Sequence, residues 1–320
     1  MYNSNRPNSI IPLTLKRLTA VAAILFGTRI SSVVGLVLPP NSPAFDGAQA
    51  LAATKKAVAF GERPSGSPEN VRQRDWILAE LKPLGGTVEL DTFSGQTPNG
   101  PVPMANIIVH FKGVSGKAIT VTGHYDTKKI PMMSFVGAND GGSSTGFLIE
   151  FARVMAKMKH RDDVLIVFFD GEEAVGNWTA SDSCYGSRHL AAKWLADGTL
   201  KNVKALINVD MIGDKSLNVM NDENSSASLR EMTQKAAAKL GHSQYFEKTP
   251  GAIEDDHKPF AEAGVNVLDL IDFAYGPDNG FWHNAKDTMD KLSAHSLQVV
   301  GDVVVELVRQ LDTPPKPASY

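Results

Sequence analysis

The chain has 320 residues, of which 42% are hydrophobic and 21% are charged, and its net charge is -3. This composition is that of an ordinary globular protein, and a pI near 6.2 argues against nucleic acid or an anionic membrane surface as a partner. The single cysteine, Cys184, excludes an intrachain disulfide and a zinc site built from several cysteines. Any metal would therefore have to be held by His, Asp and Glu.

The N-terminal segment has the composition of a targeting sequence. Residues 1–45 contain no Asp or Glu, and an apolar stretch at 18–38, interrupted by Arg29, follows basic residues. The basic residues are Arg6, Lys16 and Arg17. This order predicts a signal peptide or an N-terminal anchor, and thus a secreted or periplasmic protein. Arg29 argues against a clean spanning helix, because Arg at the bilayer centre costs roughly 2.5–3.5 kcal/mol. The alternative is a disordered basic tail or an organelle transit peptide.

After this leader, apolar residues recur with helical spacing or in the short runs typical of strands. The predicted helices are 44–60, 69–81, 143–158, 187–195, 227–240 and 294–311. The predicted strands are 87–93, 105–111, 118–122, 164–169, 206–209 and 266–271. The loop SGQTPNG at 94–100 would join the first two strands. Strands that alternate with helices predict an α/β fold, a single-domain three-layer α/β/α sandwich with a mostly parallel mixed sheet. This domain would cover 44–312, between the linker PPNSP at 39–43 and a Pro-rich tail at 313–320.

Polar side chains recur just after the predicted strands, where ligands bind in open α/β sheets. His124 follows the strand AITVT, and Glu172 and Glu173 follow the strand VLIVFF. Asp210 ends another strand, and His283 lies in a loop beyond the last one. We therefore expect these groups to lie close together, although they are far apart in the sequence.

Asp140 belongs to the Gly-rich segment GANDGGSS, whose small residues would let the backbone approach a metal closely. Two histidines with several carboxylates form a ligand set that suits zinc. Asp126 could orient the imidazole of His124. Taken singly, His124 could be a hydrogen-bonded core residue, Asp210 a turn cap and Asp140 the acceptor of an Asx-turn. Their joint placement at one edge of the sheet favours a zinc site.

The chain resembles the zinc peptidase family M28 in segments spread in the family's order over about residues 44–312. These segments are GERPSGSP, GHYDT, GAND, FFDGEE, the strand that ends at Asp210, and WHNAKDT. The resemblance implies the zinc-aminopeptidase fold, with Glu172 as the general acid/base. The ligands that it implies for one metal are Asp140, Glu173 and His283. In the family's aminopeptidases the second zinc would be held by His124 and Asp210, with Asp140 bridging.

Other segments resemble the glutaminyl-peptide cyclotransferases (glutaminyl cyclases), a branch of that family. They are an insertion that carries Trp178, the run DSCYGSRHLA, the segment EDDHKPF at 254–260, and Trp282 directly before His283. The resemblance implies that Trp178 and Trp282 wall an apolar pocket for a glutaminyl side chain. It also implies that Asp255 forms a hydrogen-bonded acidic cluster with Asp210, and that both take part in catalysis.

The predicted function is therefore the zinc-dependent conversion of the N-terminal Gln of peptides to pyroglutamate, with release of ammonia and one bound zinc. The alternative is a di-zinc aminopeptidase. GANDGG and HNAKDTMDKLS resemble the hydrolases, and Glu254 occupies a substrate-binding position where animal cyclases have an amide. A non-catalytic binding ectodomain is a third reading, against which the intact ligand set argues. The predicted partners are peptide or protein N-termini, the predicted state is a monomer, and only residues 18–38 would contact a membrane.

Overall fold

The computed structural model describes residues 44–246 and 249–313. The predicted leader at 1–43 lies outside these residues, as does the predicted tail after its first residue. Within the described part of the chain, no helix combines the length and hydropathy needed to cross a membrane.

The main sheet has six strands in the order β1-β2-β4-β3-β5-β8. β3, β4, β5 and β8 are parallel, whereas β1 and β2 form an antiparallel hairpin whose second strand pairs antiparallel with β4. The predicted mostly parallel mixed sheet is thereby confirmed. The strands are β1 (Thr87–Thr97), β2 (Gly100–Phe111), β3 (Ala118–His124), β4 (Asp163–Phe169), β5 (Val203–Asp210) and β8 (Val267–Ile271). A separate two-stranded sheet, which the sequence did not predict, pairs β6 (Asn221–Asp222) with β7 (Pro250–Gly251).

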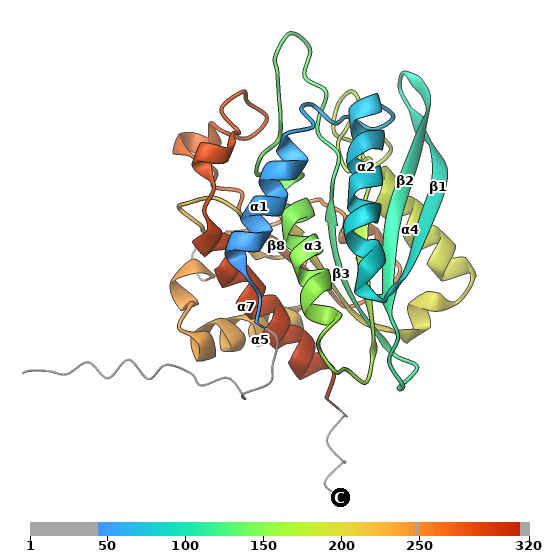
Figure 1. The fold of residues 1–320 in the computed structure, drawn as a ribbon, viewed down its shortest axis with the longest axis vertical. Coiled ribbons are helices and arrows are strands. Elements are labelled where there is room, and N and C mark those ends of the chain that lie inside the picture. Colours follow the sequence, from blue (N-terminus) through green and yellow to red (C-terminus); the bar gives the residue numbers. More distant parts are fainter. Residues whose placement is uncertain (1–43, 247–248, 314–320) are drawn as a thin grey trace, which may run out of the picture. The chain divides into compact units, whose positions relative to one another are not determined.

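Helices cover both faces of the main sheet (Figure 1). α1, α2, α3, α5 and α7 pack on one face and form the larger core, and α4 and α6 pack on the other. In β4, alternate side chains enter the two cores, with Ile166 in the larger core and Val167 in the smaller one. This alternation follows from the period of two along a strand, and it explains why the run VLIVFF is apolar throughout.

Most helices match their predicted ranges, and several begin where the sequence supplies a cap. The side chain of Ser67 accepts a hydrogen bond at the start of α2, where Pro68 occupies the first turn. Ser293 caps α7 in the same way. Only α6 was not predicted, because five residues are too few for a periodic pattern. The helices are α1 (Gly47–Val58), α2 (Pro68–Leu81), α3 (Gly142–Met155), α4 (Tyr185–Ala196), α5 (Ala227–Leu240), α6 (Lys258–Glu262) and α7 (Ala294–Leu311).

The predicted loop at 94–100 is wrong, because most of that segment belongs to the β1–β2 hairpin. The ladder continues to the pair Thr97 and Gly100, so only Pro98 and Asn99 form the turn. The Thr97 hydroxyl donates to the Gly100 carbonyl at 2.6 Å and accepts from the Asn99 amide at 3.2 Å. The ribbon is largely exposed here, so it needs no apolar run, and its polar composition resembled a loop.

The four parallel strands bring their carboxyl ends to one edge of the sheet, as expected for this topology. β3 ends at His124 and β5 at Asp210, and β4 is followed directly by the segment that carries Glu172 and Glu173. The loop from β3 to α3 supplies Asp140, and the loop after β8 supplies His283. The fold therefore gathers the predicted polar groups at this edge.

Candidate active site

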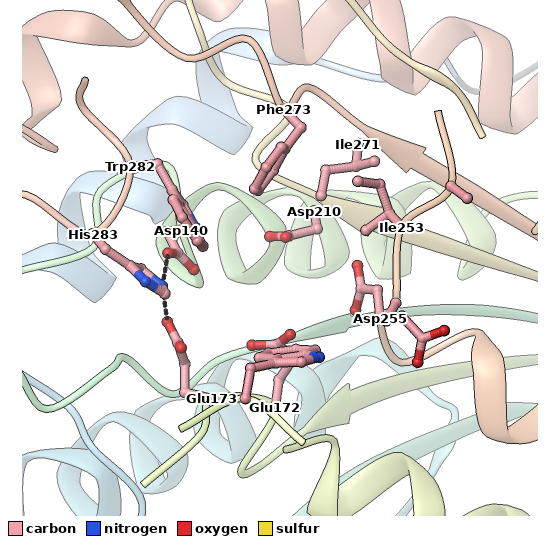
Figure 2. Close-up of a pocket in the computed structure, with 13 residues that line it drawn as sticks. Asp140, Glu172, Glu173, Asp210, Ile253, Asp255, Ile271, Phe273, Trp282 and His283 are labelled. Carbon is pink, nitrogen blue, oxygen red and sulfur yellow. Dashed lines mark hydrogen bonds and ion pairs between the residues drawn. The ribbon is translucent and has the colours of Figure 1, made fainter. Parts of the chain in front are cut away.

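His283 lies between the carboxylates of Asp140 and Glu173. Its Nε2 is 3.3 Å from Oδ2 of Asp140 and 3.1 Å from Oε1 of Glu173 (Figure 2). One ligand atom from each of the three residues lies within 4.8 Å of the others, which is close enough for a shared metal ion. The histidine and the two carboxylates come from three different loops, and they match the first ligand set that the sequence predicted.

A second possible ligand group shares Asp140 with the first. Nε2 of His124 is 3.1 Å from Oδ1 of Asp210 and 3.3 Å from Oδ1 of Asp140. All three side chains are buried, and their ligand atoms also lie within 4.8 Å of one another. The two oxygens of Asp140 thus point to different histidines, Oδ1 to His124 and Oδ2 to His283. This is the arrangement that a bridging carboxylate requires.

Several buried atoms of these two groups make no hydrogen bond within the described residues. They are Nδ1 of His124, Oδ2 of Asp140 and Oε2 of Glu173. A buried polar atom without a partner is unfavourable by about 1–3 kcal/mol, and more if it is charged. A divalent cation would satisfy carboxylate oxygens of this kind, and His with Asp and Glu suits zinc. The residues therefore fit a zinc ion.

The charges of the metal-free groups depend on one another. Burial opposes ionisation of His283, but its hydrogen bonds with Asp140 and Glu173 outweigh burial and raise its pKa to about 10. Burial would raise the pKa of Asp140, yet the hydrogen bonds of His124 and His283 lower it. Burial, followed by the charge of Asp140, raises the pKa of Glu173. Without metal, the two histidines act as the cations that balance the carboxylates.

Asp126 holds several parts of the site in place. Its Oδ1 accepts a hydrogen bond from the backbone amide of Glu172 at 3.1 Å, and its Oδ2 accepts one from Glu173 at 3.3 Å. Its Oδ1 also lies 3.5 Å from Nδ1 of His124, on the side of the ring that faces away from Asp210. The contact with His124 is the one that the sequence predicted. The contacts with the two glutamate amides were missed, because spacing does not reveal what a backbone amide donates to.

Glu172 lies beside the two possible ligand groups without belonging to either of them. Its side chain is buried, and its Oε2 is 4.0 Å from Nδ1 of His124. Burial raises the pKa of Glu172 well above its ordinary value, His124 opposes this, and the charges of Glu173 and Asp255 add to it. A buried carboxyl group whose pKa is raised holds a proton more readily than a free one, as a general acid requires.

A pocket of about 220 Å³ opens over these groups (Figure 2). This volume is below the roughly 300–1,000 Å³ of pockets for drug-sized ligands, so it suits one side chain. The two predicted tryptophans both line it and are partly exposed, Trp178 by 41% and Trp282 by 37%. The ring of Trp282 stacks on His283 at 4.0 Å and meets Phe273 edge-on at 4.9 Å. Sequence analysis missed Phe273 and the other apolar wall residues, which are Ala252, Ile253 and Ile271.

Asp255 and Glu254 line the same pocket but differ in burial. Asp255 is buried and accepts a hydrogen bond from Asn208 at 3.0 Å. Burial raises the pKa of Asp255, and the charges of Asp269 and Asp210 raise it further, so Asp210 acts on it through charge. The side chain of Glu254 is 66% exposed, with the ammonium of Lys258 3.8 Å away. Glu254 thus lies at the rim of the pocket.

The backbone is strained next to several site residues. Three of the six non-glycine residues with a left-handed φ among the described residues lie at or beside the site: Cys184 at 48°, Met211 at 51° and His283 at 47°. Met211 follows Asp210 directly, and the amide of Cys184 donates to the carbonyl of Glu172 at 2.8 Å. Such conformations are unfavourable by about 1–3 kcal/mol each and cluster at functional sites.

Asp287 was not predicted as a site residue, although it lies in the segment WHNAKDT. It is fully buried, and its carboxylate accepts the backbone amides of Asn139 at 2.8 Å and of Asp140 at 3.2 Å. The hydroxyl of Tyr275 donates to the same carboxylate at 2.7 Å. Asp287 thereby fixes the backbone that carries Asp140 relative to the loop that carries His283.

Comparison with known proteins agrees with this geometry. The sequence profile of peptidase family M28 matches residues 106–308. The chain belongs to peptidase family M28. A glutaminyl-peptide cyclotransferase of Bos taurus is 30% identical over 76% of the chain and 76% of its own length. A glutaminyl-peptide cyclotransferase-like protein of the same species is 31% identical, and the match covers 71% of the chain but 66% of that relative.

Solved structures of M28-like enzymes resemble the chain over most of its length. A glutaminyl cyclase from an Acidobacteriales bacterium is 44% identical with a TM-score of 0.82, covering 86% of the chain and 98% of that structure. A Zn-dependent exopeptidase from Parabacteroides distasonis is 27% identical with a TM-score of 0.75. The match covers 83% of the chain and 99% of that structure. The predicted zinc-aminopeptidase-like fold is thus confirmed, and both cyclases and exopeptidases share it.

Proposed function

We propose that this M28 protein is a glutaminyl-peptide cyclotransferase, which converts the N-terminal Gln of peptides to pyroglutamate and releases ammonia. One observation carries the proposal: a small pocket with aromatic and aliphatic walls ends on Glu172 and the Asp140–Glu173–His283 group. A pocket of this size accepts one side chain. The similarity to glutaminyl cyclases supports the same reaction.

In this proposal Asp140, Glu173 and His283 hold one zinc ion. The bound zinc would act as a Lewis acid that polarises the γ-carbonyl of the substrate glutamine. Trp282 stacks on His283 and keeps the ring in its orientation. Asp126 and Asp287 fix the backbone beside the two carboxylate ligands.

Glu172 moves the proton. Its carboxylate takes a proton from the substrate α-amine, whose nitrogen forms a bond to the carbonyl carbon of the side-chain amide (Cδ). The bond from this carbon to the side-chain nitrogen then breaks, and Glu172 returns the proton so that ammonia leaves. Amine and amide belong to one residue, so their proximity is intrinsic. The carboxyl groups of Asp210 and Asp255 are buried next to the reacting amine in this proposal. Together they supply the negative charge on that side of the pocket.

The pocket walls have two roles in this reaction. Trp178 and Trp282 contact the aliphatic part of the glutaminyl side chain, and with Phe273 they exclude water from the reacting carbon. Excluding water matters because hydrolysis of the amide would yield glutamate instead of pyroglutamate. Glu254 at the rim faces the rest of the peptide, so the partners are peptide or protein N-termini.

Aminopeptidase activity is the second candidate, and a specific observation favours it. The His124–Asp140–Asp210 group is complete and shares Asp140 with the first group, as a two-metal site requires. With two zinc ions, Glu172 would instead take a proton from a water nucleophile. The similarity to a Zn-dependent exopeptidase is compatible with this candidate.

Incubation of the zinc-loaded enzyme with a Gln-initiated peptide separates the two candidates. Cyclisation releases ammonia and leaves a peptide of unchanged residue number, which mass spectrometry detects. Release of free glutamine instead would refute the cyclase proposal and support the aminopeptidase. Zinc analysis of the same sample, with about one ion per chain for the cyclase and two for the aminopeptidase, provides an independent measure.

Export, by the leader at 1–43, remains a prediction, as does the monomeric state.

A further inference from the structure

We propose that Arg63 is a positioning residue for the metal site, which holds both ends of the β3–α3 loop, next to His124 and Asp126 at its start and before Asp140 at its end. This inference rests on the proposed zinc site and goes beyond the ligands and the acid/base named above. Arg63 lies in the loop between α1 and α2, in the segment GERPSGSP, and its side chain is fully buried.

The guanidinium of Arg63 binds the Asp140 loop through backbone carbonyls. Its Nη1 donates to the carbonyl of Val136 at 2.7 Å, and its Nη2 donates to that of Gly137 at 3.0 Å. Nη1 also donates to the carbonyl of Gly61 at 2.7 Å, which holds the side chain to its own loop. The backbone between Gly137 and Asp140 turns so tightly that a Cβ on Gly137 would lie 2.3 Å from the Asp140 carbonyl oxygen. Arg63 thus holds the start of this turn.

The backbone of Arg63 binds the start of the same β3–α3 loop. Its amide donates to the hydroxyl of Thr127 at 2.8 Å, and its carbonyl accepts the amide of Thr127 at 3.2 Å. Thr127 directly follows Asp126, whose carboxylate accepts the amides of both site glutamates and faces His124. A single residue outside the site therefore fixes the start of the β3–α3 loop, which follows His124, relative to its end, which carries Asp140.

The same segment also reaches the loop that carries the two glutamates. The hydroxyl of Ser65 donates to Oδ1 of Asp170 at 2.7 Å, and the side-chain amide of Asn70 donates to the same oxygen at 3.1 Å. Asp170 lies two residues before Glu172. The residues from 61 to 70 thus contact both loops that follow β3 and β4, and Arg63 makes the contacts nearest Asp140.

A buried guanidinium bound to neutral carbonyls is unusual, and it indicates a functional reason. The Nε of Arg63 has no hydrogen-bond partner among the described residues. Burial lowers the pKa of Arg63 to about 10, while the charges of Asp287, Asp126 and Asp140 raise it, so the group stays charged at neutral pH. Its charge therefore lies next to the carboxylates of the site, although its hydrogen bonds are made to backbone.

Asp287 completes the support of the Asp140 loop. Arg63 holds the carbonyls of Val136 and Gly137, and Asp287 holds the amides of Asn139 and Asp140. Arg63 is positively charged and binds backbone carbonyls, whereas Asp287 is negatively charged and binds backbone amides. All four of these backbone groups lie within residues 136–140. Loss of either should displace Asp140 while leaving the ligand side chains chemically intact.

The test is zinc binding by the full-length chain, measured without peptide by competition with a chelator. We expect R63M to raise the zinc dissociation constant about 10- to 100-fold, the range seen when residues that orient metal ligands are removed. R63K keeps the charge but cannot span all three carbonyls, so its loss should be smaller. R72M is the matched control, because Arg72 on α2 is exposed, pairs with Glu69 at 2.7 Å and should bind zinc as the unmodified chain does.

Thermal unfolding distinguishes positioning from a general loss of stability. A merely structural role would lower the melting temperature of the apo and zinc-saturated forms equally and leave the zinc-induced rise unchanged. A positioning role reduces that rise, because it depends on the dissociation constant. The inference is overturned if R63M binds zinc within about twofold of the unmodified chain, or, should R63M not fold, if folded R63K does. Peptide turnover is not involved, so failure of the cyclase proposal would leave this result unaffected.

Discussion

Asp126 offers the sharpest test of the site geometry. D126N keeps the shape of the side chain but replaces one acceptor oxygen by an NH2 group, which would face a backbone amide of Glu172 or Glu173. One charge-assisted hydrogen bond is lost, and the other weakens because the acceptor is no longer ionised. Hydrogen bonds to charged groups contribute about 1.5–3 kcal/mol. At about 1.4 kcal/mol per factor of ten, D126N should lower kcat/KM roughly 10- to 150-fold.

The assay is steady-state turnover of a Gln-initiated peptide at saturating zinc, together with the zinc dissociation constant. D163N is the matched control, because Asp163 is also a buried carboxylate that accepts a backbone amide, that of Gly113 at 2.8 Å, but it lies at the opposite end of β4. D163N should leave kcat/KM unchanged. If D126N retains kcat/KM within about threefold of the unmodified chain, the hydrogen bonds to the two glutamate amides do not support catalysis, and the reasoning is wrong.

Other substitutions test the remaining groups. E172Q should reduce kcat by roughly 10²–10⁴-fold and leave zinc affinity unchanged, and a modest loss would exclude Glu172 as the acid/base. W178A should raise KM more than it lowers kcat, with W178F in between, and equal KM values would remove Trp178 from the pocket. Burial raises the pKa of Asp163, but the hydrogen bonds of Lys112 and Gly113 outweigh it and lower the pKa overall. The contribution of Asp163 to folding stability is therefore fully present above its unfolded pKa of about 3.9. It is lost as the pH falls through the lower pKa of the folded state. Urea unfolding should show D163N destabilised by roughly 1.5–3 kcal/mol at pH 7, a difference that disappears in acid; a constant difference would contradict this.

The fold was largely predictable because its main elements are apolar and periodic. The run VLIVFF could only be a strand buried on both faces, and β4 is that strand. α5 and α7 have the predicted bounds, since capping residues and long amphipathic patterns mark them. The convergence of His124, Asp210 and His283 followed from topology alone, because parallel strands end at one edge of the sheet.

What could not be predicted depends on contacts between loops. Ile253 and Phe273 line the pocket from irregular segments, where one apolar residue carries no periodic signal. Arg63 and Asp287 act on backbone groups more than 70 residues away, and sequence spacing gives no information about such partners. The two strands of the β1–β2 hairpin were predicted, but their continuation through 94–97 and 100–104 was missed because exposed polar strands resemble loops in composition.

The site is best understood as a region of negative charge that the protein alone does not neutralise fully. Asp140 and Glu173 are buried with His283, and an oxygen of each carboxylate lacks a hydrogen-bond partner. Burial raises the pKa of Glu173, so its ionised form opposes folding, whereas the hydrogen bonds of His124 and His283 keep Asp140 ionised. The surrounding structure nevertheless holds them in place, through Asp126 and Asp287 on backbone amides and the left-handed φ of 47° at His283. Binding of a cation would remove the unfavourable free energy of burying ionised carboxylate, while the hydrogen bonds of Asp126 and Asp287 remain. A variant that binds zinc more tightly should therefore also have a more stable zinc-bound folded state.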